Sequence, residues 1–210
     1  MSTPSDLKIE NTNINTAPGV NLSTEQKTVV GCVLDLFAGR PSLPKLKLWA
    51  DDAEFVDPIT IAKGREKYQA QWYGLQSAFS EIERLSHEVT DSGNPIIMNM
   101  KTRYVIKGIG KEQTINSIIT IATAADGKIT KVEDKWDGKL PDGAISNVSF
   151  AQLFSPFWWL HYGEAWAWYL WSFTWETRAW RAFRHLNAVS VPKMISVPKN
   201  AEEDAKRGNA

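Results

Sequence analysis

The sequence predicts an α+β fold in which helices come first and long antiparallel strands follow. Apolar residues recur at helical spacing in two stretches, residues 29–37 and 68–79. Extended segments separated by turns with glycine come after them: Glu81–Asp91, Pro95–Lys107, Glu112–Thr123 and Lys128–Asp137. This order is typical of an α+β domain. We expect a cone-shaped curved sheet wrapped around the N-terminal helices, with a pocket between the two layers and an aromatic helix appended C-terminally.

The helical stretches have recognisable ends. Ser23-Thr-Glu-Gln26 is a capping-box pattern that predicts the start of the first helix, and Gly39 with Pro41 beyond it predicts the end. A short helix is expected at Leu43–Trp49, followed by a strand at Ala53–Asp57. The next helix follows Gly64, where one apolar stripe recurs at i, i+4, i+7 and i+11: Tyr68, Trp72, Leu75 and Phe79.

The composition excludes several classes of function. Lysine plus arginine and aspartate plus glutamate number 24 each, so no net charge favours nucleic acid as a partner. The single cysteine, Cys32, excludes an intrachain disulfide and favours a reducing, cytoplasmic location. Three scattered histidines give no metal-ligand spacing, and no phosphate-binding glycine loop is present. We therefore expect neither a metal nor a cofactor.

The chain divides into four regions of different composition. Residues 1–22 are polar and rich in asparagine and threonine, which predicts a disordered arm. Residues 23–140 contain the predicted helices and strands of the domain. Residues 147–187 hold seven of the ten tryptophans and predict a Trp-rich amphipathic helix. Residues 188–210 repeat Val-Pro-Lys and become charged, which predicts a flexible tail.

The Trp-rich segment has three alternative interpretations. From Pro156 to Trp175 only His161 and Glu164 can ionise, and basic residues follow up to Arg184. Tryptophan prefers the membrane interface, so Pro156–Arg184 could lie on a membrane surface and make the protein peripheral. The same helix could instead pack on its own domain or form the seam of a homodimer, or it could span a bilayer as an anchor.

Alternation along the strands assigns side chains to the pocket, because successive residues of a strand point to opposite faces. In residues 131–136, Asp134 shares a face with Val132 and Trp136, whereas the lysines face solvent. His87 falls on the face of Leu85 and Val89, with Arg84 on the other. In the following strand one side is formed by Met98, Met100, Thr102 and Tyr104.

Asp57 is the most distinctive candidate for chemistry. It follows Phe55 and Val56 and precedes Pro58, so a carboxylate ends an apolar run. Burial of a carboxyl group raises its pKa, which suits an acid or base near neutral pH. The alternative is a strand-end aspartate that caps the turn after it.

Together the inward faces predict one site. The catalytic candidates are Asp57, His87, Asp134 and Tyr104, and the ligand-binding candidates are Phe55, Tyr68, Trp72, Met98, Met100 and Trp136. A His–carboxylate pair among aromatic rings can shuttle protons. Structural alternatives stay open: His87 as a core or rim histidine, Asp134 as a loop cap or a partner of Arg103, and the aromatic and methionine side chains as core packing.

The order of elements resembles the nuclear transport factor 2-like superfamily, which includes SnoaL-like polyketide cyclases, ketosteroid isomerases and scytalone dehydratase. Trp49–Pro58 is similar to the superfamily's acidic stretch that ends in Asp-Pro, Lys63–Tyr68 to its Gly-led helix start, and Gly127–Trp136 to its last strand. The resemblance covers residues 24–139 and implies the fold rather than the reaction, because this fold carries enzymes and non-enzymatic binders.

The resemblance to ketosteroid isomerases implies that Asp57 is a general base. The positions of that enzyme's two oxyanion donors correspond to Cys32 and Ile119, which could not stabilise an enolate in the same way. Steroid isomerisation is therefore not expected. The candidate residues resemble more closely those of the cyclase and dehydratase members, in which an acid and a base assist an aldol reaction, an elimination or an isomerisation.

Three functions follow as hypotheses. The first is a small-molecule isomerase, cyclase or dehydratase that acts on a hydrophobic carbonyl compound of polyketide or terpenoid type, with Asp57 as base, His87 and Asp134 as a proton shuttle and Tyr104 as donor. The second is a non-catalytic module that binds a hydrophobic ligand or a partner and reaches membrane surfaces through its aromatic helix. The third is a structural homodimer.

Overall fold

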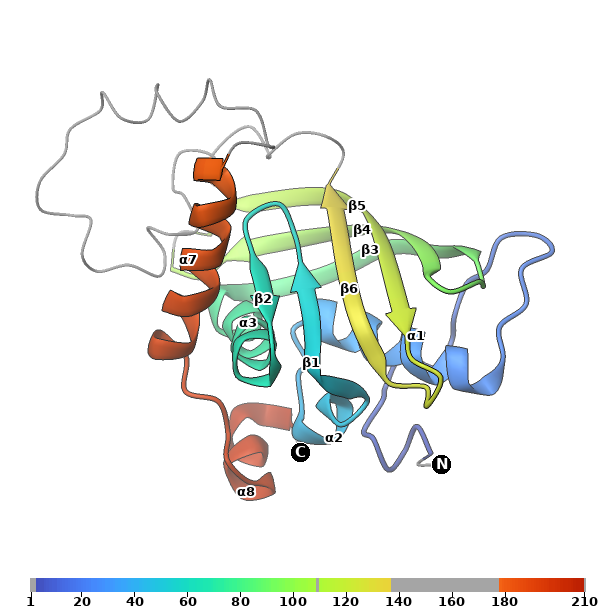
Figure 1. Ribbon diagram of the computed structural model, residues 1–210, viewed down its shortest axis with the longest axis horizontal. Coiled ribbons are helices and arrows are strands. Elements are labelled where there is room, and N and C mark those ends of the chain that lie inside the picture. The colour runs from blue at the N-terminus through green and yellow to red at the C-terminus, as the bar shows by residue number, and fades with distance from the viewer. Residues whose placement is uncertain (1–2, 109, 137–177, 210) are drawn as a thin grey trace, which may run out of the picture.

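The computed structural model describes residues 3–108, 110–136 and 178–209, and shows a curved sheet with helices on its concave side (Figure 1). The helices are α1 (Thr24–Phe37), α2 (Leu43–Leu46), α3 (Arg65–Ala78), α7 (Arg178–Met194), α8 (Ala201–Asp204) and the π-helix η1 (Ala205–Asn209). The strands are β1 (Trp49–Val56), β2 (Ile61–Lys63), β3 (Phe79–Asp91), β4 (Ile96–Ile106), β5 (Glu112–Thr123) and β6 (Ile129–Trp136). The predicted α+β fold class is confirmed.

The sheet has the strand order β2-β1-β6-β5-β4-β3. β1 and β6 are parallel, whereas the other neighbouring strands are antiparallel. The four long strands begin and end within two residues of the predicted segments, because glycine-containing turns mark their ends. The sequence pattern does not predict β2, since three residues are too few to show an alternation.

The core lies between α1, α3 and the concave face of the sheet. α1 begins at the predicted capping box, where the Ser23 hydroxyl accepts the N–H of Gln26 at 3.2 Å and the Gln26 side chain accepts the N–H of Ser23 at 2.9 Å. The helix ends at Phe37, and Gly39 turns the chain with a φ of +71°. Fully buried side chains of α1 and of the sheet form the centre of the core: Val30, Val33, Leu34, Met98, Ile119, Ile121 and Val132.

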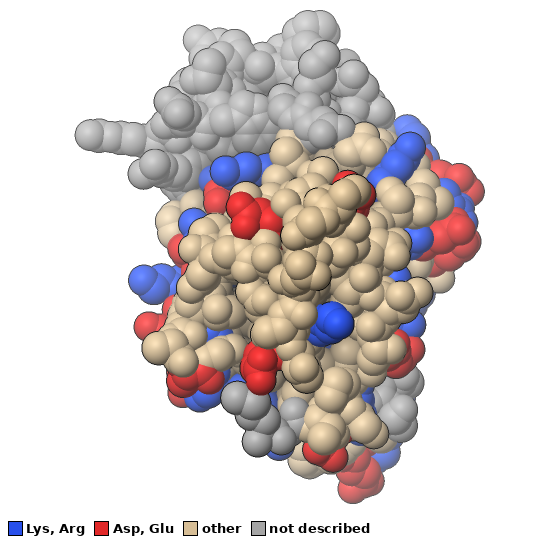
Figure 2. Space-filling model, turned by 90° about the vertical axis from the view of Figure 1, so that its right-hand side faces the viewer, with Lys and Arg blue, Asp and Glu red and all other residues tan. Residues whose placement is uncertain are grey.

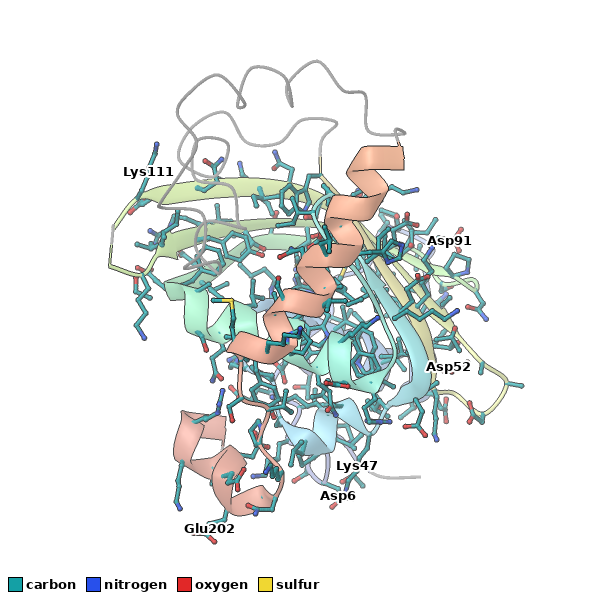
Figure 3. All side chains as sticks on the ribbon, turned by 60° about the vertical axis from the view of Figure 1, so that its left-hand side comes forward. Asp6, Lys47, Asp52, Asp91, Lys111 and Glu202 are labelled. Carbon is teal, nitrogen blue, oxygen red and sulfur yellow. The ribbon has the colours of Figure 1, made fainter. Side chains whose placement is uncertain are left out.

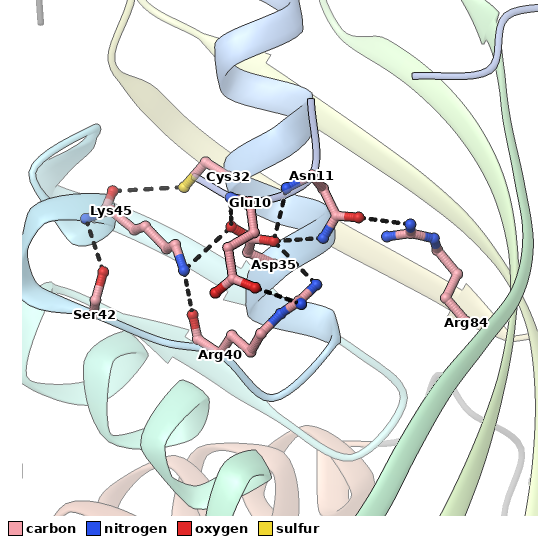
Figure 4. A network of polar contacts seen from close by, with 8 residues as sticks. All are labelled: Glu10, Asn11, Cys32, Asp35, Arg40, Ser42, Lys45 and Arg84. Atoms are coloured by element: carbon pink, nitrogen blue, oxygen red, sulfur yellow. Dashed lines mark hydrogen bonds and ion pairs between the residues drawn. The ribbon is translucent and has the colours of Figure 1, made fainter. Parts of the chain in front are cut away.

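The N-terminal segment packs against the domain, which differs from the disordered arm that its composition predicts. Leu7 and Ile9 are buried, and the buried carboxylate of Asp35 accepts the N–H of Glu10 at 2.8 Å and that of Asn11 at 3.2 Å (Figure 4). Local composition cannot reveal such a distant partner. Figure 2 views the side on which this segment lies, and the middle of that face shows few charged side chains.

The C-terminal residues also differ from the flexible tail that the sequence predicts. α7 continues to Met194 and lies across α3 (Figure 3). Beyond it, Asp204 is buried: its Oδ1 accepts the hydroxyl of Tyr73 at 2.7 Å, and its Oδ2 accepts the N–H of Leu43 at 2.8 Å. A buried carboxylate that accepts two hydrogen bonds thus attaches the end of the chain to the domain.

Most of the predicted Trp-rich helix, residues 147–177, lies outside the described residues. In the part of the chain that the structure describes, no helix is long and apolar enough to cross a membrane. All the interpretations of Pro156–Arg184, namely membrane surface, domain packing, dimer seam and spanning anchor, stay predictions.

Candidate active site

A cavity of about 60 Å³ lies between α3, the sheet and α7. Aromatic rings form much of its wall: the ring of Trp72 lies 4.5 Å from that of Phe55 and 5.1 Å from that of Phe37, measured between centroids. The carboxyl groups of Asp57 and Asp134 interrupt this apolar wall. Among the residues that the structure describes, the lining is Phe37, Phe55, Asp57, Ile59, Thr60, Gln71, Trp72, Gly74, Leu75, Phe79, Tyr104, Ile115, Asp134, Trp136 and Val191.

Asp57 follows β1, at the tight turn that connects β1 to β2. Its N–H donates to the carbonyl oxygen of Thr60 at 3.0 Å, and its Oδ1 accepts the N–H of Ile59 at 2.8 Å. The turn-capping interpretation of Asp57 is therefore confirmed. Asp57 also lines the cavity, so capping and access to a bound molecule do not exclude each other.

Asp134 lies on β6 opposite Ile119 and is buried. The predicted alternation is confirmed, since Val132 is buried on the same face and Lys135 is exposed. Asp134 Oδ2 accepts the indole N–H of Trp136 at 2.8 Å, whereas its buried Oδ1 makes no hydrogen bond to the residues that the structure describes. One carboxyl oxygen is held in place by a hydrogen bond, and the other is buried without one among the described residues.

The alternative pairing of Asp134 with Arg103 is wrong. Arg103 lies on the opposite face of β4, where its guanidinium contacts Glu81, Glu83 at 2.9 Å and Glu112 at 2.9 Å. Alternation places the two side chains on different faces of the sheet, so they cannot meet.

The environment of the cavity shifts the pKa values of three ionisable side chains that line it, those of Asp57, Asp134 and Tyr104. Burial, and after it the charge of Asp134, raise the pKa of Asp57 to about 7. Burial raises the pKa of Asp134 to about 6, against the opposing influence of the neighbouring Ser117 and Trp136 side chains. Burial and the nearby Asp134 also raise the pKa of Tyr104, so its hydroxyl remains a proton donor in hydrogen bonds.

The structure does not bring His87 to this cavity. His87 pairs with Met100 on β4, Met100 with Ser117 on β5, and Ser117 with Trp136 on β6. Three interstrand spacings, roughly 14 Å, separate His87 from β6. Its Nε2 instead accepts the N–H of Asn15 at 3.0 Å, and burial lowers its pKa. The predicted His87–Asp134 shuttle is therefore wrong, and the imidazole binds the N-terminal segment.

A β-bulge explains a second difference on β3. Arg84 pairs with Thr102 but Ser86 pairs with Lys101, so the register shifts at Leu85. Leu85, which simple alternation places beside His87, is 45% exposed. Arg84 points inward instead and donates to Asn11 Oδ1 at 2.6 Å. A single inserted residue reverses the faces of a strand, and alternation alone cannot detect it.

The predicted ligand-binding residues divide into two groups. Phe55, Trp72 and Trp136 line the cavity. Tyr68, Met98 and Met100 are core residues that do not line it. The ring of Tyr68 stacks on Trp49 at 5.0 Å between centroids, and its hydroxyl donates to the carbonyl oxygen of Ala50 at 3.1 Å. Helix packing is thus the correct interpretation of Tyr68.

Sequence reasoning misses several residues that line the site or contact the turn of Asp57, among them one of α3 and three of α7. Gln71 of α3 lies beside the apolar stripe and lines the cavity with a buried Nε2 that has no hydrogen-bond partner among the described residues. Arg184, Asn187 and Val191 come from α7, more than 100 positions after Asp57 in the chain. Only the polarity of Gln71 within an aromatic stretch could have indicated it, and nothing local indicates the others.

Replacing His87 with glutamine is expected to leave any chemistry of this cavity within about twofold of wild type, because His87 is not among the described residues that line it. Weakening of the Asn15 hydrogen bond should lower the free energy of unfolding by at most about 1 kcal/mol. Side-by-side turnover and urea-denaturation measurements check this. A tenfold or larger loss of turnover in a folded H87Q protein would restore His87 to the site.

The chain is similar to a family of known domains and to several solved structures. Residues 44–132 match the family model of the SnoaL-like domain. No curated protein shows a significant match to the chain. An NTF2-like protein from Anabaena variabilis ATCC 29413 is 15% identical, with a TM-score of 0.48, over 57% of this chain and 95% of that one.

Two other solved structures were determined with small molecules. TerC, co-crystallised with polyporic acid, is 18% identical with a TM-score of 0.43, over 52% of this chain and 91% of its own. A protein with a ketosteroid isomerase-like fold from Catenulispora acidiphila DSM 44928, in complex with trimethylamine, is 16% identical with a TM-score of 0.40, over 49% of this chain and 82% of its own.

Proposed function

Because residues 44–132 match the SnoaL-like domain and two carboxyl groups share one aromatic cavity, we propose that this protein transfers protons on a hydrophobic carbonyl compound. The reaction would be an isomerisation, cyclisation or dehydration. The observation that carries the proposal is the pair Asp57 and Asp134, whose pKa values are raised to about 7 and about 6. An acid and a base work best when their pKa values lie near the working pH.

The two carboxyl groups share one proton between about pH 6 and pH 7, because the charge of Asp134 disfavours ionisation of Asp57. In the productive form Asp57 is ionised and Asp134 is protonated. The two pKa values lie close together, so this form is accessible beside the reverse arrangement. Asp57 then removes the proton from the carbon next to the carbonyl group.

Asp134 would donate a hydrogen bond to the carbonyl oxygen of the substrate. Its Oδ2 is engaged by Trp136, so the proton resides on Oδ1, which has no partner in the described parts of the chain. Tyr104 of β4 and Gln71 of α3 also line the cavity, and their hydroxyl and amide groups would supply further donors. Such donors stabilise the negative charge that develops on the oxygen as the proton leaves carbon.

The cavity itself suggests which part of a substrate it takes. Its volume of about 60 Å³ is small. Sites that enclose whole drug-sized molecules measure roughly 300–1,000 Å³. We infer that the reacting end of an apolar compound enters between the aromatic rings, as expected for a polyketide- or terpenoid-derived carbonyl compound.

Hydrogen exchange at carbon tests the proposal on any carbonyl compound that enters the cavity. A panel of apolar ketones and β-ketoesters is incubated with the protein in D2O, and NMR follows replacement of the hydrogens next to the carbonyl. We expect at least one compound to exchange about 100-fold faster with wild type than with the D57N/D134N double variant. Equal rates for every compound would contradict proton transfer and favour a binding module.

A further inference from the structure

The helix α7 contacts the turn that holds Asp57. A guanidinium Nη2 of Arg184 donates to the carbonyl oxygen of Asp57 and, at 3.4 Å, to that of Thr60. The amide Nδ2 of Asn187 donates to the carbonyl oxygen of Ile59 at 3.1 Å and to Thr60 Oγ1 at 2.9 Å. Two side chains of one helix therefore bind three of the four residues of the turn.

The turn depends on these contacts for its orientation. Within it, the N–H of Asp57 donates to Thr60 at 3.0 Å, but the return bond from the Thr60 N–H measures 3.4 Å, and Pro58 has no N–H to donate. The Asp57 carboxyl group is bonded to the Ile59 N–H of the same turn. Its direction therefore follows the turn, and α7 fixes the turn from outside.

α7 is itself held independently of Asp57. Ala188 and Val191 are buried, and Gly74 of α3 has no side chain, which lets Val191 approach closely. Farther along, Asp204 is bonded to Tyr73 of α3. Asn187 is also only 5% exposed. The two side chains that donate to the turn therefore belong to a helix that is packed against the domain.

Arg184 also contributes charge at this position. Among the described residues, the ionisable groups around Asp57 are Asp134 from β6, Tyr104 from β4 and Arg184 from α7, while α3 supplies the uncharged Gln71. The guanidinium favours the ionised form of Asp57 and opposes the effect of Asp134. The hydrogen bonds and the charge of α7 act on the same carboxyl group.

We propose that Arg184 and Asn187 are positioning residues for Asp57, so that a helix outside residues 44–132 completes the active site. The proposal rests on the proposed role of Asp57 as a base. It assigns Arg184 to the charge and orientation of the carboxyl group, and Asn187 to orientation alone.

The pKa of Asp57 tests the role of Arg184 directly. Carbon-13 NMR follows the Asp57 carboxyl resonance, identified by its absence in D57N, through a pH titration of the full chain. In R184Q we expect the pKa to rise by about 1, as on removal of a neighbouring cation, and in R184K to stay near the wild-type value. The matched control is L186Q on the exposed face of the same helix, where Leu186 is 66% exposed and no change is expected.

The rate of hydrogen exchange at carbon tests the role of Asn187. N187A should lower the rate of hydrogen exchange at carbon about tenfold, with the pKa of Asp57 nearly unchanged, and N187S, which keeps one donor, should recover part of it. An unchanged Asp57 pKa in R184Q, or an equal shift in L186Q, would overturn the proposal for Arg184. Wild-type exchange rates in N187A would overturn the proposal for Asn187. This test does not depend on R184Q, so it also holds if R184Q does not fold. Failure of the proposed function would appear differently: the pKa of Asp57 would shift in R184Q, but wild type would show no hydrogen exchange at carbon.

Discussion

Asp57→Asn should reduce the rate of hydrogen exchange at carbon by about 10²–10⁴-fold, the range that a positioned general base contributes. Asparagine has nearly the same shape and can still accept the N–H of Ile59 through its side-chain oxygen, so the turn should persist. It cannot accept a proton at neutral pH. The measurement is the NMR exchange rate of the most reactive ketone at saturating concentration.

The stability of D57N provides the control. The pKa of Asp57 is about 7 in the folded protein against 3.8 ordinarily, so wild type loses stability as the pH rises through 7. The amide does not ionise and avoids this loss. Urea denaturation at pH 8 should therefore show D57N to be at least as stable as wild type. Unchanged exchange in a folded D57N protein would remove Asp57 from the mechanism.

Asp35→Ala is expected to have the largest effect on stability, a decrease of about 3–5 kcal/mol in the free energy of unfolding. Asp35 is fully buried in α1, and its Oδ2 lies 3.1 Å from the ammonium of Lys45, which is 3% exposed (Figure 4). The same carboxylate accepts the backbone N–H groups of Glu10 and Asn11. Without it, a buried positive charge loses its partner and the N-terminal segment loses its attachment.

Urea denaturation of D35A and E10A at neutral pH measures this difference. Glu10 also forms an ion pair, at 2.7 Å from Arg40, but its side chain is 59% exposed. Exposed pairs contribute little, so E10A should cost less than about 1 kcal/mol. Comparable losses in the two variants would mean that burial does not strengthen the Asp35–Lys45 pair.

Periodic features of the sequence predict most of the fold. The capping box at Ser23, the stripe from Tyr68 to Phe79 and the turns between the long strands all depend on neighbouring residues. The parallel pairing of β1 with β6 cannot be predicted in this way, because it joins residues that are far apart in the chain. The docked segments at both ends escape prediction for the same reason: their partners Asp35 and Tyr73 lie elsewhere.

The candidate site was predictable to the extent that strand faces determine it. Asp57 and Asp134 stand at positions whose neighbours are apolar, and both line the cavity together with Tyr104. His87 satisfies the same criterion, yet it lies three strands away, because facing inward does not specify the position along a curved sheet. Arg184 and Asn187 act through backbone carbonyl groups, which leave no pattern in a sequence.

The pH dependence of hydrogen exchange in wild type tests most directly whether the two carboxyl groups work as one acid–base pair. With pKa values of about 7 and about 6, the rate should pass through a maximum between these values and fall on both sides. D134N should lose the maximum together with most of the rate. A wild-type rate that rises near pH 3.8, the ordinary value for aspartate, and then stays level to pH 9 would contradict a shared proton.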